Sequence, residues 1–284
     1  MKPVRIGLIQ MEVSDDLRAN TAKAAANVRE AARQGARIVC LAELYRSRYF
    51  PHDEGAKVAH LAETVPGEST DAFSRLAKEL ETVIIVPVFE KTPDGRFFNT
   101  AAVIDADGAL LGTYRKTHVP YDEHYYEKSY FEPGDGGYRV HKTRYAALSV
   151  LICYDQWFPE AARASALLGA EILFYPTAIG WIDGYQAPEG DWREAWTTIQ
   201  RAHAIANGVH VAAVNRAGAE GKLRFWGSSF ICDSFGNVVG KAGEGEEVLV
   251  AKADLDRNKA VREEWGFLRN RRPDTYAALA EAGK

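Results

Sequence analysis

The sequence predicts a layered α/β fold, in which two sheets pack face to face and helices cover their outer faces. The first observation behind this prediction is that apolar runs of strand length alternate with amphipathic segments of helix length. The second is that nothing in the 284 residues resembles a linker, a repeat or a low-complexity tract. A chain of this length can bury a large core. We therefore expect one domain over residues 1–284, with a C-terminal extension.

The first half of the chain alternates between strands and helices. Apolar runs predict strands at residues 4–11, 36–43, 82–90, 91–105 and 106–116. The last two carry Pro-Asp-Gly and Asp-Gly turns, which predict a hairpin-like meander. Between the first two strands, apolar residues recur at helical spacing from Leu17 to Ala32, and Gly35 ends this helix. A second helix is expected around residues 72–80.

The second half of the chain continues the alternation. Apolar runs predict strands at residues 145–153, 171–176, 209–215, 225–233 and 246–254. Helices are expected at residues 159–169 and 191–207. Pro159 suits the first turn of the former, and Gly208 suits the C-terminal cap of the latter.

Composition and charge limit the partners of the protein. The chain is 46% hydrophobic and 26% charged, with a net charge of −4 and no basic block, so we expect no nucleic-acid partner. No apolar run is long enough to span a membrane, and no membrane association is expected. The first apolar run is broken by Gly7 and Gln10, which predicts a strand and not a signal peptide.

Cysteine usage predicts a reducing compartment. Cys40, Cys153 and Cys232 are odd in number and widely spaced, so they predict neither a disulfide framework nor a CxxC metal site. We expect a cytoplasmic protein. Cys40 and Cys232 lie within predicted strands, where packing is the expected role.

Cys153 lies where an apolar strand ends and a helix is expected to begin. A thiol that faces a helix N-terminus is shifted toward the thiolate, its reactive form. The backbone N–H of Tyr154 can then stabilise an oxyanion on a carbonyl group that the sulfur attacks. The alternative is a buried structural cysteine, which is a common fate of a free cysteine.

Two further strand ends carry groups suited to catalysis. Glu43 ends the run 36–43, where loss of solvent suits a carboxylate to act as a general base. Lys116 ends the run 106–116 and can neutralise an oxyanion. Taken singly, each is more often a side chain that points to water. Because sites in layered α/β folds gather at the carboxyl ends of strands, we expect Glu43, Lys116 and Cys153 to meet as base, oxyanion partner and nucleophile.

Three stretches of the sequence, in order, resemble the motifs of the nitrilase, or carbon–nitrogen hydrolase, superfamily. LAELYRSRYF resembles its glutamate motif, and GTYRKTHVPYDEHYYEKSYFEPGD resembles its lysine motif. VLICYDQWFPEAARASALLGAEILFYPTAIG resembles its cysteine motif, and RNRRPDTY is similar to its usual ending. The match spans nearly the whole chain, and three ordered motifs make it specific.

The resemblance implies a four-layer α-β-β-α sandwich with a Glu–Lys–Cys triad at Glu43, Lys116 and Cys153. A second glutamate of the family matches Glu127, for which the resemblance implies an orienting role near the triad. The alternative for Glu127 is a simple ion pair with Lys128 or another neighbour. The resemblance implies no metal, no organic cofactor and a homo-oligomer.

Within the superfamily, CYDQWFPEAAR and GAEILFYPTAIG look most like N-carbamoylputrescine amidases, enzymes of polyamine biosynthesis. This implies cleavage of a carbamoyl C–N bond in a small carbamoylated amine, with release of ammonia, carbon dioxide and the amine. Two positions depart from that group. Tyr154 stands where Trp is usual after the nucleophile, and Tyr121 follows Pro120 where an acidic residue is usual.

Residues that bind the substrate tail are expected in the loops near these strand ends. Our preferred candidates are Tyr49, Asp122 and Trp181, because carboxylates and aromatic faces suit an ammonium group. The alternative is that they cover the surface or fill a subunit contact.

Two other interpretations stay open. The protein can be a sister enzyme of the same superfamily, namely an N-carbamoyl-β-amino acid amidase, an aliphatic amidase or a nitrilase. It can also be a binding protein that keeps the fold without chemistry. The presence of all three triad residues favours an enzyme.

Overall fold

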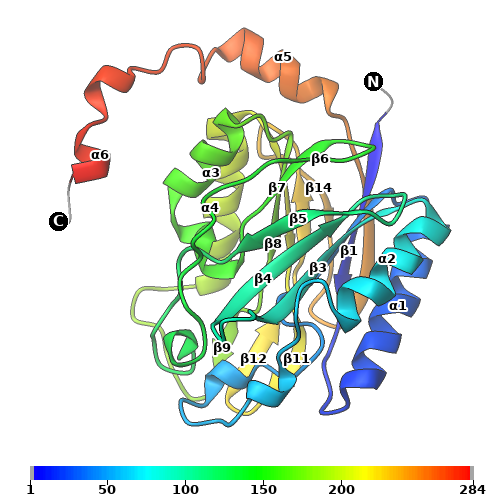
Figure 1. The fold of residues 1–284 in the computed structure, drawn as a ribbon. Coiled ribbons are helices and arrows are strands. Elements are labelled where there is room, and N and C mark those ends of the chain that lie inside the picture. The colour runs from blue at the N-terminus through cyan, green and yellow to red at the C-terminus, as the bar shows by residue number, and fades with distance from the viewer. Residues whose placement is uncertain (1–2, 282–284) are drawn as a thin grey trace.

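The computed structural model describes residues 3–281, and two six-stranded sheets form its centre (Figure 1). In spatial order the strands of the first sheet are β15 (Glu247–Ala253), β1 (Val4–Gln10), β2 (Ile38–Leu41), β3 (Val83–Lys91), β4 (Phe97–Ile104) and β5 (Leu110–Arg115). Those of the second are β14 (Val238–Lys241), β13 (Phe230–Cys232), β10 (His210–Val214), β8 (Ile172–Pro176), β7 (Ala147–Val150) and β6 (His141–Lys142). A small third sheet contains β11 (Ala217–Glu220), β12 (Leu223–Trp226) and β9 (Gly180–Ile182).

Helices cover the outer faces of both large sheets (Figure 1). The first sheet is covered by α1 (Leu17–Arg33) and α2 (Glu68–Leu80), and the second by α3 (Pro159–Leu167) and α4 (Trp192–Asn207). The predicted four-layer α-β-β-α sandwich is therefore confirmed. After β15 the chain continues through α5 (Asp256–Trp265) and α6 (Ala278–Glu281). The division into one domain with a C-terminal extension stays a prediction.

Side chains that alternate along β2 show why this segment is apolar throughout. Ile38 and Cys40 belong to the core between the two sheets, whereas Val39 and Leu41 pack on the helix side together with Val28 of α1. All four residues of the strand are buried, because both of its faces are covered.

The direction of the strands decides where their ends lie. β1, β2 and β3 run parallel, and β3, β4 and β5 form an antiparallel meander, as the two turn signals predict. Two antiparallel steps return β5 to the direction of β3, so β2 and β5 end at the same edge of the first sheet. In the second sheet β7, β8 and β10 run parallel.

The structure differs from the sequence prediction in several segments. The run 225–233 is not one strand, because Gly227 and Ser228 adopt left-handed φ angles of 56° and 57° and divide it between β12 and β13, which belong to different sheets. A Cβ at Gly227 would lie 2.5 Å from the carbonyl oxygen of Glu244, so glycine is required there. The apolar pattern does not predict the short strands β6, β9, β11 and β14, and α2 begins before residue 72, at Glu68.

Within residues 3–281, none of the helices combines the length and the apolar character needed to cross a lipid bilayer.

Candidate active site

Three charged side chains from distant segments meet at the carboxyl ends of the strands. Lys116, directly after β5, donates to Oε1 of Glu43 over 2.8 Å. It also donates to both carboxylate oxygens of Glu127, over 2.8 and 2.6 Å. Glu43 follows β2, and Glu127 begins the short 3-10 helix η3 (Glu127–Ser129). All three side chains are fully buried, so two carboxylates and one ammonium group share a site away from bulk water.

The two carboxylate oxygens of Glu43 have different surroundings. Oε1 accepts hydrogen bonds from Lys116 and, over 2.7 Å, from Nδ2 of Asn99. Oε2 is buried and has no hydrogen-bond partner among the described residues. A buried acceptor without a donor is costly, so Oε2 is suited to receive a proton.

Burial and neighbouring charges set the protonation states of the other two groups. Burial raises the pKa of Glu127 to about 7, while Lys116 opposes this shift and Glu43 adds to it. Burial lowers the pKa of Lys116, but Glu127 and Glu43 outweigh it, so the pKa lies above its ordinary value and Lys116 is an ammonium group. The hydroxyl of Tyr49 donates to Oε1 of Glu127 over 2.7 Å and holds that carboxylate from the other side.

Cys153 lies at the turn after β7, as the first residue of the 3-10 helix η4 (Cys153–Trp157). Its φ of 43° falls in the left-handed region, which costs a non-glycine residue about 1–3 kcal/mol. Asp155 supports this turn by accepting from the N–H of Ile152 over 2.8 Å. The same carboxylate accepts from the N–H of His118 over 3.0 Å, which ties the cysteine turn to the segment that carries Lys116.

The expectation that a helix N-terminus holds Cys153 as a thiolate is wrong. α3 does begin at Pro159, as predicted, six positions after Cys153. Burial raises the pKa of Cys153 well above its ordinary value, and among its charged neighbours Glu43 raises it while Lys116 lowers it. The sulfur therefore carries its proton at neutral pH and needs a base before it can act as a nucleophile.

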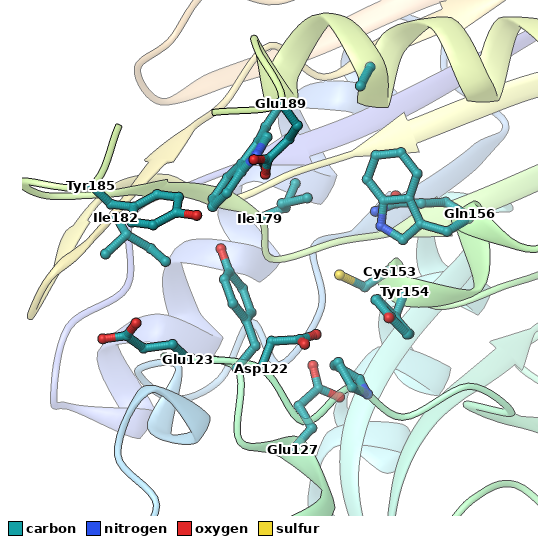
Figure 2. A pocket seen from close by; sticks show the side chains of 15 residues that line it. Asp122, Glu123, Glu127, Cys153, Tyr154, Gln156, Ile179, Ile182, Tyr185 and Glu189 are labelled. Atoms are coloured by element: carbon teal, nitrogen blue, oxygen red, sulfur yellow. Dashed lines mark hydrogen bonds between the residues drawn. The ribbon is translucent and has the colours of Figure 1, made fainter. Parts of the chain in front are cut away.

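A cavity of about 390 Å³ opens over the thiol. Figure 2 shows the side chains of Cys153, Asp122 and Glu127 directed toward the same space. Its walls carry aromatic rings and carboxylates, which include Tyr125, Tyr154, Tyr185, Trp192, Glu123 and Glu189. None of the described residues that line the cavity is a lysine or an arginine. The cavity therefore suits a small ligand with apolar and cationic parts.

Comparison with known proteins identifies the family. A model of the family described as carbon–nitrogen hydrolase matches residues 5–263, which is most of the chain. The chain belongs to the carbon–nitrogen hydrolase family. Membership in this family makes the protein a hydrolytic enzyme.

Relatives of this carbon–nitrogen hydrolase cover nearly its whole length. It is 44% identical to an N-carbamoylputrescine amidase of Solanum lycopersicum, over 97% of this chain and 94% of the relative. It is 37% identical to a citrullinase of Francisella tularensis, over 97% of this chain and 98% of the relative. Its fold matches the crystal structure of a carbon–nitrogen hydrolase from Helicobacter pylori with a TM-score of 0.93 and 40% identity, over 98% of both chains.

The three residues predicted to bind the substrate tail lie in different places in the hydrolase. Asp122 lines the cavity. Tyr49 is fully buried behind Glu127 and does not belong to the cavity lining. Trp181 also lies outside the lining and packs edge-on against Trp226, with ring centroids 5.3 Å apart. Of the three, only Asp122 is placed to touch a ligand in this cavity.

Two supporting residues of the hydrolase are not among the predicted site residues. Asn99 binds Glu43, and Asp155 holds the cysteine turn. Asn99 is a polar residue inside the buried strand β4, a departure from the apolar pattern that marks it as a candidate. Asp155 follows the nucleophile candidate by two positions, and nothing in the sequence distinguishes it from an exposed acid.

Glu43 and Glu127 are already paired with a cation, because Lys116 binds both carboxylates. Over the described part of the chain, no group of three or more His, Cys, Asp or Glu side chains is arranged to hold a metal ion. That the hydrolase works without a metal or organic cofactor stays a prediction.

Proposed function

We propose that this hydrolase cleaves the carbamoyl C–N bond of a small carbamoylated amine such as N-carbamoylputrescine. The products are ammonia, carbon dioxide and the free amine. The observation that carries the proposal is the cavity over Cys153, where a thiol lies beneath acidic and aromatic walls. The similarity to the N-carbamoylputrescine amidase of Solanum lycopersicum supports it.

In the first half of the proposed reaction, Cys153 is the nucleophile and Glu43 is the general base. The free Oε2 of Glu43 receives the thiol proton as the sulfur attacks the carbamoyl carbon. Lys116 and the backbone N–H of Tyr154 stabilise the oxyanion. Protonated Glu43 then gives its proton to the terminal amino group. The C–N bond breaks, ammonia departs, and an N-alkyl thiocarbamate stays on the sulfur.

In the second half of the reaction, water replaces the sulfur. Glu43 takes a proton from a water molecule, which attacks the thiocarbamate carbon. The C–S bond breaks, the proton returns to the sulfur, and an N-alkyl carbamic acid leaves and decomposes to the amine and carbon dioxide. Glu127 holds Lys116 in place throughout the reaction. The hydrogen bond that Tyr49 donates to Glu127 holds this carboxylate in turn. Tyr49 is therefore proposed as a positioning residue and not as a substrate contact.

The tail of the substrate is proposed to be cationic. Asp122 and Glu123 lie on one loop, and Glu189 lies on another segment of the cavity wall. Carboxylates on separate walls, together with aromatic faces, can bind the three N–H groups of a primary ammonium. A carbamoylated acid would need a cationic partner, and none of the described lining residues supplies one. Trp181 is not retained as a tail-binding residue.

The experiment that tests this function measures ammonia release from a panel of substrates. N-carbamoylputrescine should be hydrolysed at least about tenfold more efficiently than N-carbamoyl-β-alanine, because a hydrogen bond to a charged group is worth about 1.5–3 kcal/mol. Citrulline, an aliphatic amide and a nitrile complete the panel. Preference for any of these would replace the proposed substrate, and no turnover of any compound would favour a binding protein.

Three further statements about this hydrolase are predictions. The protein is proposed to form a homo-oligomer, to act in the cytoplasm and to serve polyamine biosynthesis. Light scattering of the purified chain tests the first of these. Cell fractionation tests the second, and the third depends on the identity of the substrate and follows from the panel.

A further inference from the structure

We propose that Arg216 is a positioning residue that sets the distance between the base Glu43 and the thiol of Cys153. The inference rests on the proposed roles of Glu43 and Cys153. Arg216 does not belong to the lining of the cavity, and its guanidinium group is occupied by main-chain carbonyl groups and by Glu220. It acts through the main chain that carries Glu43.

The guanidinium group of Arg216 holds three carbonyl groups of the turn that follows β2. The side chain is fully buried. Its Nε donates to the carbonyl oxygen of Glu43 over 3.1 Å. Its Nη2 donates to the carbonyl oxygen of Leu44 and, over 2.7 Å, to that of Ser47. Together with the hydrogen bond that the N–H of Ser47 donates to the carbonyl oxygen of Leu44 over 3.2 Å, this side chain closes the turn of residues 43–47.

This turn needs an external support. Leu44 has a φ of 49°, and a leucine in the left-handed region costs about 1–3 kcal/mol unless its surroundings hold it there. The carbonyl groups of the turn point into the protein and require donors. Without Arg216 the turn would relax, and Glu43, the residue before Leu44, would move with it.

Glu220 extends the same support to Tyr49. Its Oε1 accepts from Nη1 of Arg216 over 2.6 Å, and its Oε2 accepts from the backbone N–H of Tyr49 over 2.5 Å. Tyr49 in turn donates its hydroxyl to Glu127. We call Arg216, Glu220 and the segment 43–49 that they hold the Arg216 brace. A single buried ion pair thus supports the main chain at Glu43 and the tyrosine behind Glu127.

The place of Arg216 in the fold explains why the Arg216 brace affects the distance between Glu43 and Cys153. Arg216 follows β10, which lies in the second sheet beside β8, and β8 lies beside β7. β7 leads to Cys153, whereas β2 of the first sheet leads to Glu43. The Arg216 brace therefore ties the strand end that carries the base to the sheet that carries the nucleophile.

Lysine cannot replace arginine in this brace. The acceptors lie around a planar fork: three carbonyl oxygens and one carboxylate oxygen receive four hydrogen bonds from three nitrogens. A lysine presents one nitrogen with three donors, so Arg216→Lys keeps the charge beside Glu220 and loses the hold on the turn.

The test compares Arg216→Lys with Arg262→Lys. Arg262 is the control, because it is partly buried and likewise donates to main-chain carbonyl groups, those of Ala170 and Asn207, over 2.8 and 3.3 Å. We expect the kcat of Arg216→Lys to fall about 100-fold with KM changed less than about twofold, since small displacements of a catalytic group have effects of this size. Arg262→Lys should lose thermal stability and keep its kcat.

A second readout separates this inference from the proposed function. Alkylation of Cys153 by chloroacetamide requires loss of the thiol proton and does not require the natural substrate. We expect the alkylation rate of Arg216→Lys to fall about 100-fold at neutral pH, and the difference from wild type to narrow at alkaline pH, where the thiol ionises without the base. If wild type releases no ammonia from N-carbamoylputrescine but shows this alkylation difference, the positioning role stands and the substrate is wrong.

The inference is overturned if Arg216→Lys alkylates and turns over like Arg262→Lys. It is also overturned if both variants lose kcat equally, because the effect would then be general destabilisation. Should Arg216→Lys fail to fold, Glu220→Gln carries the test. This variant keeps Arg216 and removes the charge that orients it, and we expect an alkylation rate at least about tenfold below that of wild type. Wild-type alkylation by Glu220→Gln would reject the brace.

Discussion

Lys116 binds Oε1 of Glu43 over 2.8 Å and leaves Oε2 of the same carboxylate without a partner among the described residues. One oxygen is thus fixed and the other is free to take a proton. Cys153, whose pKa is raised chiefly by burial, needs such an acceptor. The two oxygens of Glu43 therefore have separate roles: Oε1 binds Lys116, and Oε2 accepts a proton.

Replacement of the base should abolish catalysis without unfolding the protein. Glu43→Gln keeps the shape of the side chain but cannot accept a proton, so we expect kcat to fall about 10³-fold, within the usual contribution of a general base. Ammonia release measures kcat, and the thermal midpoint should stay within about 4 °C of wild type. Glu63→Gln, a change at a mostly buried glutamate that pairs with Arg46, is the control. A kcat within tenfold of wild type would remove Glu43 from the role of base.

Glu127 should make stability depend on pH. Burial is the main cause that raises its pKa from 4.5 to about 7 in the folded protein, so the folded state binds this proton more tightly than the unfolded chain does. The group therefore contributes stability below pH 4.5, and this contribution is lost as pH rises to about 7. Glu127→Gln does not titrate. In urea unfolding over this range, the free energy of unfolding of wild type should fall with rising pH relative to the variant. Parallel curves for the two proteins would show that Glu127 does not titrate in this way.

Much of the site can be predicted because of where strands end. Glu43, Lys116 and Cys153 each follow an apolar run, and parallel directions bring the ends of β2 and β5 to one edge. Glu127 follows no strand. Only the motif that surrounds it in the sequence predicts its place beside Lys116, where it forms two hydrogen bonds.

Residues whose orientation depends on tertiary contacts cannot be predicted in this way. Trp181 and Ile182 are neighbours in β9, so their side chains point to opposite faces of the strand. Of the two, Ile182 lines the cavity. The face that each presents follows from pairing with β12, which joins segments about 40 positions apart and leaves no local pattern. Arg216 is similar, because its partners at residues 43–47 are distant in sequence.

The charge of Asp122 should select for a cationic substrate tail. Asp122→Asn should raise KM for N-carbamoylputrescine by about tenfold to a hundredfold, since it removes a charged hydrogen bond in the cavity. KM for N-butylurea, a neutral compound of similar length, should change less than about twofold. Asp183→Asn, at an exposed acid outside the cavity lining, is the control and should change neither value. Equal effects of Asp122→Asn on both compounds would show that the charge of Asp122 does not recognise the cationic tail of the substrate.

In the proposed reaction the sulfur of Cys153 forms a covalent intermediate with the help of Glu43 and Lys116. The most direct measurement is mass spectrometry of the enzyme quenched with acid during turnover of N-carbamoylputrescine. We expect a mass increase equal to the substrate minus ammonia, located at Cys153. It should be present in Cys232→Ala and absent in Cys153→Ala, which should also release no ammonia. Ammonia release by Cys153→Ala at the wild-type rate, with no adduct on either protein, would contradict the proposed covalent intermediate.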